Sequence, residues 1–172
     1  MRKLQISVIG GSSCDVTTAE QAEAVGRLLA EAKATLVCGG YGGVMEAACR
    51  GAKSAGGQTV GILIGYDHDE ANPWCDVVIP TGMGLARNAL VVASGQAVIA
   101  IDGRYGTLSE VALALNLNRP VISLSSWGFG EGDREVLPPP LKPRSFPEGR
   151  LHYAGSPEEA VALALRLAEE AE

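Results

Sequence analysis

The amino-acid sequence predicts an α/β protein with a Rossmann-like, doubly wound and mostly parallel sheet flanked by helices. Short apolar runs alternate with segments of helical periodicity along almost the whole chain. Most of these runs are apolar throughout, as is typical of parallel strands covered on both faces. The 22 glycines cluster where several of the runs end. The length of 172 residues favours a single domain that spans residues 1–172.

The predicted strands are short stretches rich in valine, isoleucine and other apolar residues, bounded by glycine, proline or polar residues. In chain order they are Gln5–Ile9, Thr35–Cys38, Thr59–Ile64, Asp76–Ile79, Ala97–Ile101 and Val121–Leu124. Pro80 is expected to stop the fourth of these strands.

Helices are predicted between the strands. A capping box with Thr17 as N-cap and Glu20 at the third helical position begins the first helix. Residues 156–172 form a C-terminal helix with Ser156 as N-cap and Pro157 at its first position. Residues 131–150 hold five of the nine prolines and are expected to be an irregular excursion. The helix that the capping box begins covers residues 19–32. Further helices are predicted at residues 44–55 and 107–117, and residues 82–94 are predicted to form a loop followed by a helix.

Composition limits the classes of partner. A net charge of −6 argues against a nucleic-acid binder, which would need a basic surface. The N-terminus lacks a signal-peptide pattern and no apolar run reaches the length of a membrane span. We therefore expect a cytoplasmic protein without membrane contact. The four cysteines show neither a C-x-x-C nor a zinc-binding spacing, so we expect reduced thiols and no metal site.

Three glycine-rich segments follow predicted strands and precede helices. Glycine lets a backbone approach an anion closely, and a helix N-terminus presents unsatisfied N–H groups to it. Because ligands bind at the carboxyl ends of parallel strands, all three segments are predicted to bind a phosphate. None matches G-x-G-x-x-G or the P-loop motif. The residues are Gly10, Gly11, Ser12 and Ser13; Gly39, Gly40, Gly42, Gly43 and the following Met45; and Gly103, Arg104, Tyr105, Gly106 and Thr107.

Arg87, Thr107 and Glu110 are the candidate polar groups beside these loops. Arg87 can provide a bidentate cation, and Thr107 can offer its hydroxyl and N–H to a phosphate. Glu110 lies one helical turn after Thr107, on the same face. The spacing of Thr107 and Glu110 is also that of a simple capping box, which would give them a purely structural role.

The segment Gly103-x-x-Gly106-Thr107-x-x-Glu110 resembles the P-G-G-x-G-T-x-x-E signature of the Lonely Guy-like proteins, formerly called lysine decarboxylases. Residues 39–46 (GGYGGVME) are similar to the other glycine motif of that family. Arg87 stands 15 residues before Asp102, matching the spacing of the family's active-site arginine. The resemblance extends over residues 4–124. It implies at least a homodimer, and alanine-rich faces of the helices from Val44 and Thr107 would suit packing between subunits.

The resemblance implies a nucleoside 5′-monophosphate phosphoribohydrolase, which would release the base and ribose 5-phosphate. Arg87 and Glu110 match catalytic positions. Glu110 could stabilise the oxocarbenium-like charge or orient the water. No cofactor is required, although an AMP-like nucleotide, phosphate or molybdenum cofactor could be the small phosphorylated ligand.

Residues 84–92 (GLARNALVV) are more similar to another branch, the molybdenum-cofactor carrier proteins, which bind a pterin phosphate without hydrolysis. Hydrolases of the family usually have Arg-Lys where this chain has Arg87-Asn88. Asp102 replaces the proline of the signature, and Arg104 replaces its second glycine. These departures make binding a firmer expectation than catalysis, and a non-catalytic carrier is the alternative function.

Overall fold

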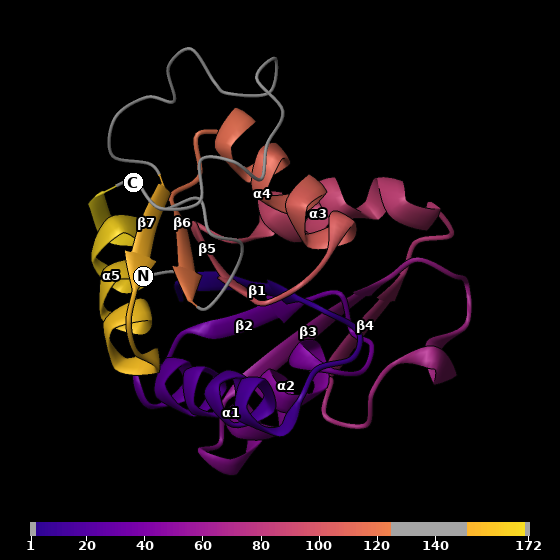
Figure 1. Ribbon diagram of the computed structural model, residues 1–172. Coiled ribbons are helices and arrows are strands. Elements are labelled where there is room, and N and C mark those ends of the chain that lie inside the picture. The colour runs from indigo at the N-terminus through magenta and orange to yellow at the C-terminus, as the bar shows by residue number, and fades with distance from the viewer. Residues whose placement is uncertain (1–2, 125–150, 171–172) are drawn as a thin grey trace.

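Parallel strands form one sheet in the part of the chain that the computed structural model describes, residues 3–124 and 151–170 (Figure 1). They are β1 (Gln5–Gly10), β2 (Thr35–Cys38), β3 (Gln58–Leu63), β4 (Val77–Pro80), β5 (Ala97–Ile101), β6 (Val121–Leu124) and β7 (Leu151–Ala154). Their order is β4-β3-β2-β1-β5-β6-β7, and all neighbours pair in parallel. The predicted fold class is confirmed.

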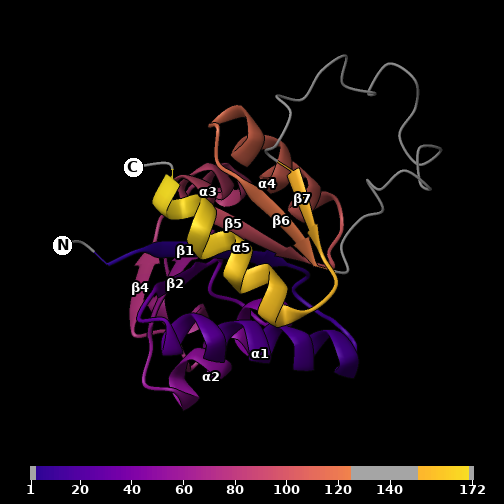
Figure 2. The ribbon, with the colours of Figure 1, turned by 90° about the vertical axis from the view of Figure 1, so that its left-hand side faces the viewer.

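Helices cover both faces of this sheet. One face carries α1 (Val16–Glu31), α2 (Val44–Ser54) and α5 (Pro157–Glu170), and the other carries α3 (Asn88–Ser94) and α4 (Tyr105–Asn116). Figure 2 shows α5 beside α1 and across β5 and β6. The strands thus bury apolar side chains on both faces, and all five residues of β5 are buried. None of the described helices is long and apolar enough to span a membrane.

The strand order reverses between β1 and β5. β1 continues to β2 on one side, while its other neighbour is β5, with Ile6 paired to Ala97 and Gly10 to Ile101. The connections leave this central pair in opposite directions, so their loops diverge and open a crevice above the carboxyl ends of the strands. The glycine segments after β1 and β5 flank this point, and the segment after β2 is adjacent.

Helices α1 and α2 pack with their backbones in close contact. A Cβ atom added at Gly26 would meet the carbonyl oxygen of Ala48, and one added at Gly51 would meet that of Glu23. Alanines 47, 48 and 52 of α2 are buried within the same chain. α1 therefore covers the alanine-rich face of α2 for which the sequence analysis expected a subunit contact. Small residues let helices of the same chain approach closely as well as helices of two subunits.

Local details of the elements differ in part from the expectations drawn from the sequence. The N-cap of α1 is Asp15, not Thr17, and the Asp15 carboxylate accepts a hydrogen bond of 2.7 Å from the Thr18 N–H. β4 ends at Pro80, as expected, and the proline is itself the last strand residue, which is tolerated because β4 is an edge strand.

The sequence analysis missed β7, because most of its residues are only half-buried at the other sheet edge and form no apolar run. At α5 the N-cap expectation is confirmed, because the Glu159 N–H donates to the Ser156 Oγ at 3.2 Å. The expected excursion at residues 131–150 lies outside the described residues.

Candidate functional site

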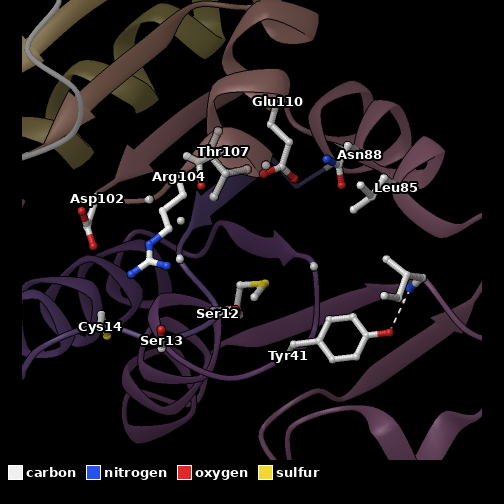
Figure 3. Close-up of a pocket in the computed structure, with 18 of the residues that line it drawn as sticks. Ser12, Ser13, Cys14, Tyr41, Leu85, Asn88, Asp102, Arg104, Thr107 and Glu110 are labelled. Carbon is white, nitrogen blue, oxygen red and sulfur yellow. Dashed lines mark hydrogen bonds between the residues drawn. The ribbon is translucent and has the colours of Figure 1, made fainter. Parts of the chain in front are cut away.

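A cavity of about 810 Å³ lies at the carboxyl edge of the sheet, where the strand order reverses (Figure 3). It is formed by the loops after β1, β2 and β5 together with the segment before α3. Its volume is in the upper part of the range for small-molecule sites. The lining residues are Ile9, Gly10, Gly11, Ser12, Ser13, Cys14, Asp15, Gly39, Tyr41, Met45, Ile64, Leu85, Arg87, Asn88, Asp102, Gly103, Arg104, Gly106, Thr107 and Glu110.

The first and second glycine loops are packed directly against each other. The Val44 N–H donates to the Gly11 carbonyl at 3.0 Å, and a Cβ at Gly43 would collide with Gly11 and Ser12. Gly43 also has a φ of +63°, a conformation that favours glycine. Gly40, Gly42 and Gly43 do not line the cavity, in contrast to Gly39. These three glycines instead shape the loop that carries Gly39.

Arg87 is the most confined cation of the site. Its exposed fraction is 6%, and its guanidinium lies over Gly39, where an added Cβ would come within 2.5 Å of Nη1. The Tyr41 ring packs beside it, with its centroid 5.9 Å from Cζ. Nε of Arg87 is buried and has no hydrogen-bond partner among the described residues. A buried guanidinium with an unsatisfied donor suits an anionic ligand.

Tyr41 is fixed in place from its far end. Its hydroxyl donates to Glu70 Oε2 at 3.0 Å and accepts from the Ile64 N–H at 3.0 Å. Figure 3 shows the ring along one side of the cavity. A ring held in this way offers a flat wall to a planar heterocycle.

Glu110 lies beside Arg87 in the lining of the cavity. Its Oε1 lies 3.8 Å from Arg87 Nη1, longer than a direct N–H···O hydrogen bond, and both side chains are buried. Burial raises the pKa of Glu110 to about 7, although the charge of Arg87 acts in the opposite direction. The carboxyl group therefore changes its protonation state near neutral pH, and it can exchange a proton with a ligand there.

The third loop has an unusual backbone at Asp102. Its φ is +49°, and Gly103 follows with +117°. Thr107 packs over Gly103, leaving no room for a side chain there. Proline, whose φ is held near −65°, cannot adopt the conformation of Asp102. The Lonely Guy-like signature has proline where this chain has Asp102. The loop thus adopts a conformation here that the proline of the signature would not permit.

Helix α4 begins at Tyr105, two residues earlier than the sequence suggested, with Arg104 as its N-cap. Thr107 is therefore the third helical residue, and the capping-box interpretation of Thr107 and Glu110 was wrong. No side chain caps α4 or α2, whereas Asp15 caps α1. These two helices follow the second and third glycine loops, and helix ends of this kind attract anions.

Arg104 and Tyr105 occupy different environments. Arg104 is exposed but lines the cavity, and Figure 3 shows its guanidinium extending toward the loop of Ser13 and Cys14. Tyr105 is 82% exposed and does not line the cavity. The other predicted ligand residues that line it are Gly10, Gly11, Ser12, Ser13, Met45, Gly103, Gly106 and Thr107.

Sequence reasoning missed several lining residues. Asn88 is buried, and its Nδ2 donates to Ser109 Oγ at 3.1 Å, which ties the start of α3 to α4. Its position directly after Arg87 was a possible signal. Leu85 and Ile64 supply apolar wall, and Cys14 and Asp15 close the end near the first loop. No pattern in the sequence marked these four.

The cavity and its loops can be compared with known proteins. Residues 3–161 match the SLOG cluster4 family. The chain belongs to this family. The SLOG cluster4 family is a group within the Lonely Guy-like superfamily, so the resemblance predicted from the glycine motifs is confirmed.

A relative and two solved structures are similar to this chain over most of its length. An uncharacterized protein of Archaeoglobus fulgidus is 48% identical over 134 residues, which cover 78% of this chain and 88% of the relative. The molybdenum cofactor binding protein from Rippkaea orientalis is 36% identical, with a TM-score of 0.83, over 97% of this chain and 98% of that one. The molybdenum cofactor carrier protein from Chlamydomonas reinhardtii is 30% identical, with a TM-score of 0.80, over 98% and 99%.

Proposed function

We propose that this protein binds the molybdenum cofactor, or a closely related pterin phosphate, and acts as its carrier. The observation that carries the proposal is likeness over nearly the whole chain to two solved proteins named for binding or carrying this cofactor. This supports the function that the sequence offered as its alternative more than it supports the phosphoribohydrolase.

The residues of the cavity fit such a ligand. The loops at Gly10–Ser13 and Gly103–Thr107, with the uncapped start of α4, would hold a phosphate. Arg87, which lines the cavity, would bind an anionic group through its guanidinium, and Tyr41 would contact the pterin ring. Arg104, at the exposed rim, provides a second cation. The cofactor's own redox chemistry belongs to the enzyme that receives it, so the carrier needs to bind, shield and release it.

One observation favours hydrolysis as a second candidate function. Glu110 is a buried carboxyl group with its pKa raised to about 7, and it faces Arg87 in the cavity. Such a group can act as a general acid or base at neutral pH, as cleavage of an N-glycosidic bond requires. The same pKa also serves a carrier, because protonation of Glu110 removes a negative charge beside an anionic ligand.

The two functions are separated by one pair of assays. The purified protein is mixed with molybdenum cofactor released from a donor enzyme, and bound pterin is measured by fluorescence after gel filtration. In parallel, the protein is incubated with AMP and other nucleoside 5′-monophosphates, and free base is measured. We expect about one pterin per chain and no base release.

An Arg87→Gln variant should weaken pterin binding at least about tenfold, since a charged hydrogen bond contributes more than about 1.4 kcal/mol. Arg27→Gln is the matched control, because Arg27 lies outside the cavity lining and forms an exposed ion pair with Glu31. Release of base that disappears in Glu110→Gln, without pterin binding, would establish the hydrolase instead.

A further inference from the structure

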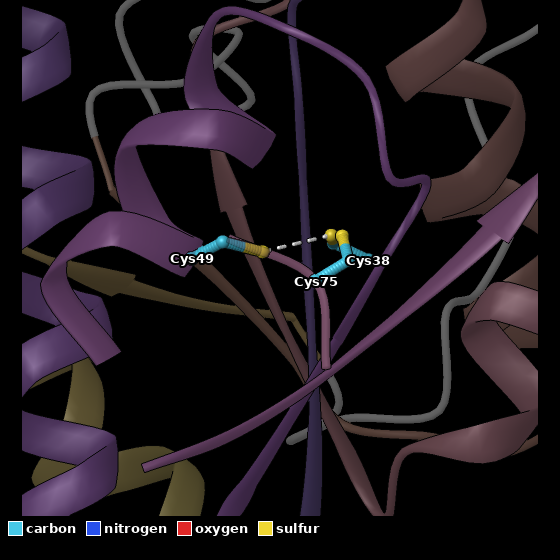
Figure 4. A group of neighbouring side chains, drawn as sticks. All are labelled: Cys38, Cys49 and Cys75. Atoms are coloured by element: carbon cyan, nitrogen blue, oxygen red, sulfur yellow. Dashed lines mark hydrogen bonds between the residues drawn. The ribbon is translucent and has the colours of Figure 1, made fainter. Parts of the chain in front are cut away.

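Three of the four cysteines meet in space, although the sequence shows no metal-binding spacing (Figure 4). Cys38 is the last residue of β2, Cys49 lies within α2, and Cys75 precedes β4. Their sulfur atoms all lie within 4.8 Å of one another, and the Cys38 and Cys49 sulfurs are 3.5 Å apart. The fourth, Cys14, lines the ligand cavity.

The surroundings of the three thiols are enclosed and suited to negative sulfur. Cys38 and Cys49 are fully buried, and Cys75 is partly exposed, which leaves a route from solvent. The Gly40 N–H donates to Cys38 Sγ at 3.3 Å, and the Asn72 side chain hydrogen-bonds to Cys75. Gly61 leaves the space for Cys75, because a Cβ there would lie 2.8 Å from its sulfur.

Without a cation the three thiols cannot all ionise. Like charges close together disfavour ionisation, and burial does so further because it removes water from around a thiolate. Three thiolate sulfurs within 4.8 Å of one another, two of them on fully buried side chains, therefore require a positive partner.

We propose that Cys38, Cys49 and Cys75 form a binding site for a single thiophilic d10 metal ion, Cu(I) or Zn(II). Thiolate sulfur binds such ions at about 2.3 Å, which places three sulfurs around one ion about 4 Å apart. The observed cluster spans this separation. A disulfide would engage only two of the sulfurs at about 2.05 Å and would leave the third thiol without a role.

The shape of the cluster bears on which ion it takes. The group consists of three sulfurs, with no histidine or carboxylate joining it among the described residues. Three soft ligands complete a trigonal site for Cu(I), whereas Zn(II) in a structural site takes a fourth ligand. Each thiol that ligates the ion releases its proton to the buffer. The Gly40 N–H and the Asn72 amide offset the remaining negative charge.

The ion would join three segments of the chain. The segment that carries Cys75 also holds the second glycine loop, because the Asn72 N–H donates to the Gly40 carbonyl at 2.8 Å and Asn72 Nδ2 donates to the Tyr41 carbonyl at 3.0 Å. Metal at the cluster would therefore also stabilise the floor of the cavity. This site does not depend on the proposed carrier function.

The test uses the full chain, reduced and freed of metal by a chelator. One sample is titrated with Zn(II) against a chromogenic zinc chelator, and another with Cu(I) under nitrogen against bicinchoninate. We expect one equivalent of one of the two ions to be taken up, and the sample that shows uptake identifies it. With the ion bound, one thiol, Cys14, should remain reactive in the native protein.

Variants separate this site from unspecific thiol binding. Cys75→Ser, at the least buried of the three positions, should weaken metal binding about 100-fold or more, while Cys14→Ser should leave it unchanged. Circular dichroism checks that both variants fold. Uptake of neither ion by the reduced protein, equal losses in the two variants, or a Cys38–Cys49 disulfide with no metal uptake after reduction would each overturn the proposal.

Discussion

At the scale of single residues, Glu110 and Arg87 determine how the site responds to pH. The pKa of Glu110 is about 7 in the folded protein, against an ordinary value of 4.5. The protonated, neutral form therefore contributes stability that is fully present below pH 4.5 and lost as the pH rises through 7. Above that pH the fold contains a buried carboxylate that Arg87, at 3.8 Å, only partly compensates.

Glu110→Gln should therefore stabilise the protein at pH 8, by about 2 kcal/mol, and have little effect at pH 4.5. Gln is close in shape and stays neutral throughout this range. Urea unfolding of both proteins at the two pH values measures the difference. Equal stability gains at both pH values would show that burial of the charge is not the cause.

Asp102 is the second residue whose environment makes a specific prediction. Because its φ is +49°, Asp102→Pro should cost about 3 kcal/mol, although proline is the residue of the family signature. Asp102→Gly should be tolerated, since glycine adopts positive φ readily. Thermal unfolding of the two variants tests this, and an Asp102→Pro protein as stable as the natural one would contradict it.

At the residue scale, the motifs predicted which residues lie together at the cavity, while the roles assigned to them stay predictions. Arg87, Glu110 and Thr107 were identified and do line the cavity. Asn88 was missed as a lining residue because its role depends on Ser109 in another helix. The cysteine cluster was missed because its members come from a strand, a helix and a loop, and only the sheet brings such distant positions together.

At the scale of elements, the contact between α1 and α2 is set by two glycines. Gly26→Ala should destabilise the protein by about 3 kcal/mol or more, because its Cβ would meet the Ala48 carbonyl and the helices would have to separate. Gly106→Ala is the matched control, with open space around its added Cβ inside α4.

The free energy of unfolding of the Gly106→Ala control should increase by up to about 1 kcal/mol, from helix propensity alone. The midpoints of denaturant unfolding give both values. If Gly26→Ala behaved like Gly106→Ala, the close packing of the two helix backbones would have no energetic importance.

The strands were the most predictable elements, because a strand covered on both faces must be apolar throughout, as Ala97–Ile101 is. The ends of elements were less predictable. Thr17 and Glu20 fit the pattern of a capping box, yet Asp15 two residues earlier holds the helix end. β7 lacks a strong apolar pattern because an edge strand buries less of its surface.

At the scale of the whole molecule, the cavity joins loops from both halves of the chain. A ligand that binds only the folded state stabilises it, by about 2.7 kcal/mol at a concentration 100 times its Kd. Saturating pterin phosphate should therefore raise the melting temperature of the natural protein. The increase should be largely lost in Arg87→Gln and retained in Arg27→Gln, and an equal increase in all three proteins would place the ligand elsewhere.

Assembly into a homodimer stays a prediction that the resemblance implies. The alanine-rich face of α2 no longer supports it, because α1 covers that face. Light scattering during gel filtration would give the mass directly, to be compared with 17.8 kDa for one chain.

The reversal of strand order between β1 and β5 also has a consequence for how the protein folds. The residues paired there, Ile6 with Ala97 and Gly10 with Ile101, lie 91 positions apart in the sequence. Forming this pair closes a long loop, which is a slow step compared with the local β–α–β contacts of the first half. On the ribosome, the first half can form its sheet before β5 has been made. Ligand capture would then come last, once the nascent chain has completed its central strand pair.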